Sequence, residues 1–419
     1  MRRALTAAAT ATALTLSTTA CSLISDEKPV TITWWDTSDA KNEAPAFKAL
    51  VKDFENAHPG IKVTYVNVPF ADAQTKFQTA AAAKKAPDVL RADVGWLPGF
   101  AKAGYLAPLD GTPAEPDDFY FERKLIRQAT YKEHLYGAPQ TTDTLALMYN
   151  KDLFARAGIT DAPVTWDELK ADMAKVKERT GVDGFAFNPQ AYFAMPFLFG
   201  EGTDLVDADY ERITVNSPEA LKGMKTLQSI LKSPGARKLD TTDKAYANIM
   251  DAFSNGKVAS IIQGPWETAN LFKGAAFTNK ENLGIATMPT GSFGRGTPLG
   301  GHNLVASSTS PAAQQAASQK FIAFMTSAPS QEKIALANGT LPTRIDAFTA
   351  KVVFKPEIAA FHLVLKDGVP RQPIPEYTAL YAAMEPNLLN ILTGRATAQQ
   401  GLKSTADQTL RLLPEYHTP

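Results

Sequence analysis

Aromatic and acidic side chains occur together just after several strand-like apolar runs of this 419-residue chain. The positions are Asp36 and Asp39, Asp93 and Trp96, and Trp266. Flat rings pack on the apolar face of a sugar, and carboxylates accept hydrogen bonds from its hydroxyl groups. The residue types therefore favour a site that holds a carbohydrate by non-covalent contacts.

Two more residues fit this interpretation, because Asp143 lies between two strand-like runs and Tyr192 lies in an aromatic loop. Ligands of open α/β sheets bind beyond the carboxyl ends of strands, which is where these residues fall. The alternative is that each aromatic residue belongs to the core or to a domain interface. Asp143 and Trp266 are the preferred candidates, because the chain should cross or border a cleft at both.

Motifs of catalysis and of other ligand classes are missing from the sequence. It has no GxSxG elbow, no phosphate-binding GxxxxGK[ST] loop and no GxGxxG after a strand, and its five histidines are not spaced for a zinc motif. We therefore expect no cofactor, no metal and no enzyme activity. A glycoside hydrolase is kept as an alternative, because its two carboxylates are usually far apart in the chain. The 43 basic and 43 acidic residues cancel, which leaves no basic surplus for nucleic acid.

The order of the predicted elements indicates an α/β fold. Strand patterns at 30–35 and 61–65 flank a helix whose apolar face consists of Phe47, Leu50, Val51 and Phe54. Such a βαβ unit has parallel strands. Further buried strands are predicted at 88–90, 145–149, 258–262 and 283–288, so we expect parallel sheets. Helix starts are predicted from the cap residues Thr165, Ser217, Ser310 and Thr397.

The N-terminal residues are typical of an export signal. Arg2 and Arg3 precede an uncharged stretch that ends in small residues before Cys21, the only cysteine. We predict a signal peptide at 1–20, a lipidated N-terminus and spacer at 21–28, and a lipid on the Cys21 thiol. The alternative is a buried free cysteine, and the arginine pair leaves the export route open. The remaining chain of roughly 400 residues is long for one core and fits two domains.

Several longer segments resemble one known family, in the same order along the chain. They are Val30–Trp35, Pro59–Val63, Pro87–Val89, Gly95–Leu97, Gly104–Asp110, Tyr136–Pro139, Leu145–Asp152, Thr165–Glu168, Asn255–Trp266, Leu299–His302 and Leu341–Arg344. Together they resemble the sugar-binding proteins of carbohydrate ABC transporters, which are extracellular solute-binding proteins of family 1. Within that family the chain is most similar to the maltose/maltodextrin-binding lipoproteins of actinobacteria.

The resemblance implies a two-lobed α/β fold of the type II periplasmic-binding-protein kind, with the ligand cleft between the lobes. The N-lobe is expected at 29–141 plus 303–339, and the C-lobe at 145–301 plus 342–419. The hinge is expected at 142–144, 302 and 340–341.

The resemblance also implies ligand-binding residues. Those that exchange hydrogen bonds with sugar hydroxyls are Glu43, Asp93 and Asp143 as acceptors and Arg371 as donor. Those that stack on sugar faces or line the cleft are Tyr192, Trp266, Trp96 and His302. Further candidates are Asp36, Asp39 and Arg344. Ala92 stands where the best-known maltose-binding protein has a tryptophan, and His302 stands where relatives have an aromatic residue, so the exact sugar is left open.

The expected function is binding of a maltose- or maltodextrin-type oligosaccharide and its delivery to the membrane permease of an ABC importer. We expect a monomer, lipid-anchored to the outer face of the cell membrane. One alternative is another di- or oligosaccharide, such as trehalose or cellobiose. Another is a different ligand class, such as a polyamine, a metal or a peptide.

The predicted anchor can be tested by replacing the thiol that would carry the lipid. Cys21→Ser should release the protein into the medium, because a binding protein without its acyl chains has no hold on the bilayer. Cell fractionation measures the release, and sugar binding by the released protein should be unchanged. A Cys21→Ser protein that stays with the membrane would exclude Cys21 as the anchor.

Overall fold

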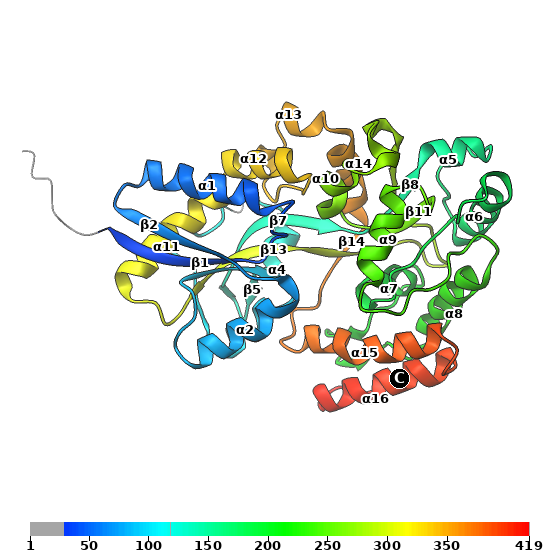
Figure 1. Ribbon diagram of the computed structural model, residues 1–419. Helices are drawn as coiled ribbons and strands as arrows, with labels where there is room; N and C mark the ends of the chain where they lie inside the picture. The colour runs from blue at the N-terminus through cyan, green and yellow to red at the C-terminus, as the bar shows by residue number, and fades with distance from the viewer. Residues whose placement is uncertain (1–28, 118, 419) are drawn as a thin grey trace, which may run out of the picture.

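The computed structural model describes residues 29–117 and 119–418. The predicted signal peptide at 1–20, the spacer at 21–28 and Cys21 lie outside the described residues. Figure 1 shows two groups of helices and strands, with β7 and β13 running between them.

The first sheet has the strand order β14-β13-β3-β1-β2, and β4 and β7 also pair with β13. Its strands are β1 (Val30–Asp36), β2 (Ile61–Asn67), β3 (Val89–Asp93), β4 (Leu106–Ala107), β7 (Ala138–Thr144), β13 (Thr297–Ser307) and β14 (Gly368–Pro370). β1 is parallel to both β2 and β3, which confirms the predicted βαβ unit. Between β1 and β2, α1 (Ala44–Ala57) buries the predicted apolar face of Phe47, Leu50, Val51 and Phe54.

β13 brings together the segments that the sequence assigns to the hinge. It is antiparallel to β3 and to β7, with Gly301 opposite Thr142. The Thr142 N–H in turn donates a hydrogen bond to the Leu341 carbonyl oxygen at 3.0 Å. The three segments therefore lie side by side, while the exact lobe boundaries stay a prediction.

The second sheet shows that the expectation of parallel strands was wrong for this part of the chain. β8 (Ala146–Asn150) lies between β11 (Ser260–Gln263) and β12 (Leu283–Ala286) and is antiparallel to both. The strands lie where buried strands were predicted, so the error concerns direction. β8 and β11 are almost entirely buried. The sequence of a short apolar strand that is buried on both faces does not show whether it pairs parallel or antiparallel with its neighbours.

The remaining elements fall into two groups. With the first sheet lie α1, α2 (Phe70–Ala82), α3 (Leu97–Lys102), α4 (Arg123–Gln128), α11 (Ala312–Met325), α12 (Ala328–Asn338) and the hairpin of β5 (Thr130–Tyr131) and β6 (His134–Leu135). With the second lie α5 (Lys151–Arg156), α6 (Trp166–Thr180), α7 (Ala191–Phe199), α8 (Pro218–Lys232), α9 (Ala245–Ser254), α10 (Thr268–Leu271), α13 (Ala350–Val353), α14 (Pro356–Val364), α15 (Tyr377–Leu392), α16 (Ala398–Leu412) and the hairpin of β9 (Val206–Asp207) and β10 (Arg212–Ile213).

The hydrophobic core divides in the same way. One cluster draws its buried residues from 32–138 and 304–334, and the others draw theirs from 145–288 and 335–416. Each group of elements therefore buries its own apolar faces. No helix among the described residues combines the length and the apolar character that a membrane crossing requires.

Three of the four predicted helix starts are confirmed. Thr165 and Thr397 form capping boxes at α6 and α16, and the Ser217 hydroxyl caps α8. The prediction for Ser310 was wrong, because α11 begins at Ala312 and the Ser310 hydroxyl donates to Asp88 Oδ1 at 2.6 Å instead.

The close pairing of β7 with β13 depends on Gly301, and replacing this glycine tests the fold. Gly301 has φ +129°, and a Cβ there would lie 2.3 Å from the Thr141 carbonyl oxygen. Gly301→Ala should lower the free energy of unfolding by about 1–3 kcal/mol, because an alanine is strained in this conformation. Urea unfolding measures the loss, with Gly60→Ala as control, since a Cβ at Gly60 meets nothing within 4 Å. Equal stability of the two variants would contradict this account.

Candidate ligand-binding site

The antiparallel pairing of β13 brings three of the predicted site residues together. His302 of β13 lies opposite Asp93 of β3, and Gly300 lies opposite Asp143 of β7. Residues that face each other on antiparallel strands have Cβ atoms about 5 Å apart. Asp93, Asp143 and His302 therefore lie within reach of one ligand.

Arg371 reaches this place from the segment between β14 and α15. Its guanidinium binds the Asp93 carboxylate with both Nη atoms, and the two side chains are only 12% and 9% exposed. The rings of Tyr192 and Tyr381 lie 5.5 Å and 5.9 Å from Arg371 Cζ. Burial alone would lower the pKa of Arg371, but Asp93 and the two tyrosines raise it above its ordinary value. The cation is therefore fixed between one acid and two aromatic rings.

Asp143 is the least satisfied of the acids. Its Oδ1 accepts a long hydrogen bond of 3.4 Å from the Tyr192 hydroxyl. Burial, reinforced by the negative charge of Asp93, raises the pKa of Asp143 to about 7. Gly300 makes room for this contact, because a Cβ there would lie 2.2 Å from Asp143 Oδ1 and 2.8 Å from the Tyr192 hydroxyl oxygen.

Glu43 forms a second charged group with Arg91, a residue that the sequence interpretation missed. The two side chains are 3.8 Å apart between Glu43 Oε1 and Arg91 Nη2 and are almost completely buried. Burial raises the pKa of Glu43, and Arg91 opposes this shift. Arg91 also donates to Gln140 Oε1 at 3.1 Å and to Thr141 Oγ1 at 3.3 Å, which ties it to β7.

The predicted aromatic residues differ in what they offer a ligand. Trp266 is partly exposed and lies flat against Gly264, where a Cβ would come within 1.9 Å of the ring. Its indole N–H donates to the Tyr246 hydroxyl at 2.8 Å, which holds the ring in place. Trp96 is only 5% exposed, because the ring of Phe70 covers it at a centroid distance of 5.0 Å.

Asp93, Asp143, Tyr192, His302, Arg371 and Tyr381 form what we call the polar cluster. Several of its polar atoms are buried and have no hydrogen-bond partner within the described residues. They are both ring nitrogens of His302, Arg371 Nε and the Tyr381 hydroxyl. Burial, with the positive charges of Arg91 and Arg371 nearby, lowers the pKa of His302 well below its ordinary value, so the imidazole is neutral at pH 7. Buried polar groups normally have hydrogen-bond partners. These atoms are therefore the candidates for hydrogen bonds to a polar ligand.

Three of the predicted residues have other partners. Asp36 is fully buried and accepts hydrogen bonds from Ser38 and from the Tyr65 hydroxyl, the latter at 2.6 Å. Asp39 is exposed and accepts from the backbone N–H groups of the turn before α1. Arg344 is paired with Asp346 at 2.8 Å and 2.6 Å. A role of Asp36, Asp39 or Arg344 in ligand binding stays a prediction.

The sequence contained partial signals for the residues that were missed. Arg91 is a charged residue in the middle of a short strand that begins with Val89 and Leu90, and a charge buried there requires a partner. Tyr381 follows Tyr377 by one helical turn on α15, so both rings lie on the same face of the helix. Nothing in the local sequence marks Phe70 as the ring that covers Trp96.

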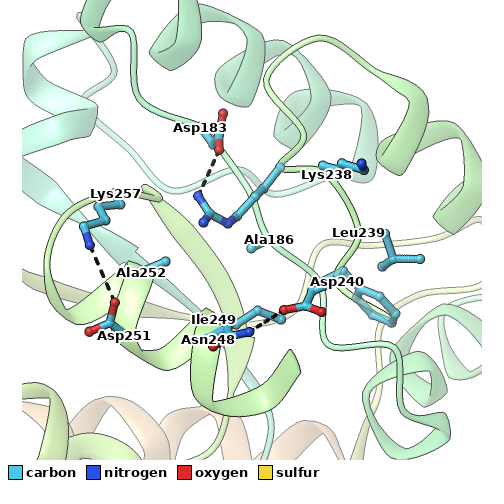
Figure 2. Close-up of a pocket in the computed structure, with 12 residues that line it drawn as sticks. Asp183, Ala186, Lys238, Leu239, Asp240, Asn248, Ile249, Asp251, Ala252 and Lys257 are labelled. Carbon is cyan, nitrogen blue, oxygen red and sulfur yellow. Dashed lines mark hydrogen bonds and ion pairs between the residues drawn. The ribbon is translucent and has the colours of Figure 1, made fainter. Parts of the chain in front are cut away.

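A hollow of about 610 Å³ lies apart from this cluster, between α9 and the segment that carries Arg237, Lys238 and Asp240. Figure 2 shows its lining, in which Asp183, Asp251 and Asp240 each have a partner. These pairs are Arg237 to Asp183 at 3.1 Å, Lys257 to Asp251 at 3.6 Å and Asn248 to Asp240 at 2.7 Å. Because its three acids are paired and none of the residues around Asp93, Asp143 and Arg371 lines it, the hollow is not the candidate site.

The shifted pKa of Asp143 predicts a pH dependence of stability. A carboxyl whose pKa rises from 3.8 to about 7 on folding binds its proton more tightly in the folded state, so its contribution to stability falls as the pH rises between these values. The stability of the wild type relative to Asp143→Asn should therefore decrease from pH 4 to pH 7 and stay constant above. Urea unfolding at several pH values measures the difference. A difference that does not fall over this interval would mean that Asp143 is already ionised in the folded protein.

The chain is similar to known binding proteins. The GacH receptor of Streptomyces glaucescens, solved unliganded and in complex with acarbose and an acarbose homolog, is 36% identical with a TM-score of 0.89, over 93% of this chain and 100% of that one. The diacetylchitobiose binding protein DasA of Streptomyces coelicolor is 29% identical over 306 residues, 70% of this chain and 69% of that protein. A maltooligosaccharide ABC transporter solute-binding lipoprotein of Streptococcus pneumoniae is 26% identical over 385 residues, 88% of this chain and 86% of that protein.

The likeness to GacH confirms the two-lobed α/β fold that the resemblance implied. Residues 40–332 match the family model described as bacterial extracellular solute-binding protein, which is well over half of the chain. The chain therefore belongs to the bacterial extracellular solute-binding protein family.

Proposed function

We propose that this protein binds a maltose- or maltodextrin-type oligosaccharide between its lobes and delivers it to the permease of a carbohydrate ABC importer. The observation that carries the proposal is the set of buried, unpartnered polar atoms of His302, Arg371 and Tyr381 beside aromatic rings. A sugar offers hydroxyl groups that both donate and accept hydrogen bonds, so one ligand can satisfy the imidazole, the guanidinium and the phenol together.

The cluster and the nearby rings offer several contacts that would contribute to affinity. Stacking of a sugar on Trp266 and on Tyr192 contributes about 0.5–1.5 kcal/mol each. Hydrogen bonds to charged groups such as Arg371 contribute about 1.5–3 kcal/mol each. Because association itself costs free energy of a similar size, the affinity depends on several of these contacts forming together.

The names of similar proteins support a sugar as the ligand class. They name diacetylchitobiose, maltooligosaccharide and acarbose. Because diacetylchitobiose is not a maltose-type sugar, another di- or oligosaccharide, such as trehalose or cellobiose, is kept as the alternative. Because the family consists of binding proteins, it supports a role without catalysis, and the hydrolase alternative has no observation in its favour.

Closure of the two lobes is the proposed route by which binding is signalled. Sugar that contacts Asp93 from one lobe and Trp266 from the other stabilises the arrangement in which the lobes are close. The hinge at 142–144, 302 and 340–341 would absorb the motion. The closed protein would then dock on the permease, and the proposed lipid on Cys21 would keep it at the outer face of the membrane.

Calorimetry with maltose, maltotriose, trehalose and cellobiose tests the ligand class. We expect binding of the α-glucosides. Trp266→Ala should weaken this binding about 10-fold, because the variant lacks the indole ring beside Gly264 on which a sugar would stack. Trp266→Phe is the matched control, since it keeps a ring and loses only the hydrogen bond to Tyr246.

Two outcomes would contradict the proposal. In the first, no sugar binds the wild type while a polyamine or a peptide raises its melting temperature in a thermal-shift screen. In the second, the purified protein hydrolyses a maltodextrin, which would restore the hydrolase alternative.

A further inference from the structure

Phe70 presents an aromatic face beside the buried cluster. It is the first residue of α2, directly after Pro69, and its side chain is 48% exposed although it is large and apolar. Its ring lies 5.0 Å from that of Trp96 at an interplanar angle of 30°, and 5.9 Å from the His302 ring at 77°. An apolar ring with this exposure has one side anchored and the other open to solvent.

The ring of Phe70 is held in place by its contact with Trp96. Trp96, only 5% exposed, contacts Phe100, and Phe100 in turn lies 4.8 Å from Phe77 in the core. Pro69 fixes the backbone at the start of the helix. A preordered ring loses little side-chain entropy when a ligand packs on it, so the contact is favourable for binding.

The position of Phe70 relative to the polar cluster defines what it would contact. The ring touches the edge of His302, whose nitrogens are buried, and His302 lies opposite Asp93 in the strand pairing. Phe70 is half exposed, whereas Asp93, Asp143 and Arg371 are largely buried, so its open face lies on the solvent side of these three groups. Under the proposed function, a sugar unit on that face would be a further unit of an oligosaccharide whose other units the three buried groups hold.

We infer that Phe70 is a stacking platform for an additional sugar unit and sets a preference for longer oligosaccharides. This inference rests on the proposed function. Trp96, expected from the sequence to line the cleft, then acts as the support of this platform. The competing explanation is that Phe70 only shields Trp96 from water and contacts no ligand.

The test compares affinities for maltose and maltotriose by calorimetry in the wild type and in Phe70→Ala. We expect Phe70→Ala to weaken maltotriose roughly 3- to 10-fold and maltose less than about 2-fold, since the shorter sugar does not reach the ring. Phe70→Tyr should restore the wild-type ratio. Tyr210→Ala is the matched control, because Tyr210 is 69% exposed and its ring faces Arg212 on the β9–β10 hairpin.

The outcomes separate this inference from the proposed function. If the wild type binds both sugars and Phe70→Ala leaves their affinity ratio unchanged, Phe70 only shields Trp96 and the inference is wrong. If Phe70→Ala weakens both sugars equally, with a melting temperature like that of the wild type, the ring contacts the central units and the chain-length preference is wrong. If the wild type binds neither sugar, the proposed function itself is wrong.

Discussion

The pairing of β13 with both β3 and β7 is the constraint on which the candidate site depends. This single strand of 11 residues places His302 beside Asp93 and leaves Gly300 and Gly301 opposite Asp143 and Thr142. Side chains at the two glycines would collide with the Asp143 carboxylate and with the Thr141 carbonyl oxygen. The glycines therefore allow a close approach of backbones that brings acidic side chains from different strands to one place. A looser pairing would not bring Asp93, Asp143 and His302 together.

The balance of buried charge indicates what the site can accept. Two arginines, Arg91 and Arg371, lie close to the acids Glu43 and Asp93, and buried charges of this kind are tolerated only when they are paired. Asp143 has no ion pair of its own, and burial, together with the negative charge of Asp93, raises its pKa to about 7. An anionic ligand would add an uncompensated negative charge, because both arginines are already paired, whereas a cation could pair only with the ionised form of Asp143. A neutral ligand rich in hydroxyl groups can bond to both the neutral and the ionised form of Asp143, which agrees with a sugar.

Local sequence patterns predicted the elements and part of the site, and the limit of such patterns is visible in particular residues. The helix face of Phe47 to Phe54 and the capping boxes at Thr165 and Thr397 depend on neighbours a few positions away, and these predictions are confirmed. The direction of β8 depends on strands more than 100 residues away. The burial of Trp96 depends on Phe70, 26 positions earlier in the chain, and no pattern connects the two. Residue type thus selected several side chains that the fold brings together, whereas the exposure of each side chain is decided by tertiary contacts.

The contacts around Arg371 link ligand affinity to the approach of the two lobes. The segment from Arg371 to Thr378 lies on the segment from Asp93 to Lys102, through the Arg371–Asp93 pair, a hydrogen bond of 3.0 Å from the Thr378 hydroxyl to the Gly95 carbonyl oxygen, and a 2.7 Å ion pair between Lys102 and Glu376. The last of these is exposed, so solvent screens it and it contributes little to stability. The buried pair therefore determines how the segments meet. In the proposed lobe division these contacts bridge the lobes, and none of them involves sugar. Under the proposed function, a sugar would shift the lobes toward closure only by the free energy that it gains beyond these contacts, so Arg371 and Asp93 would affect both closure and affinity.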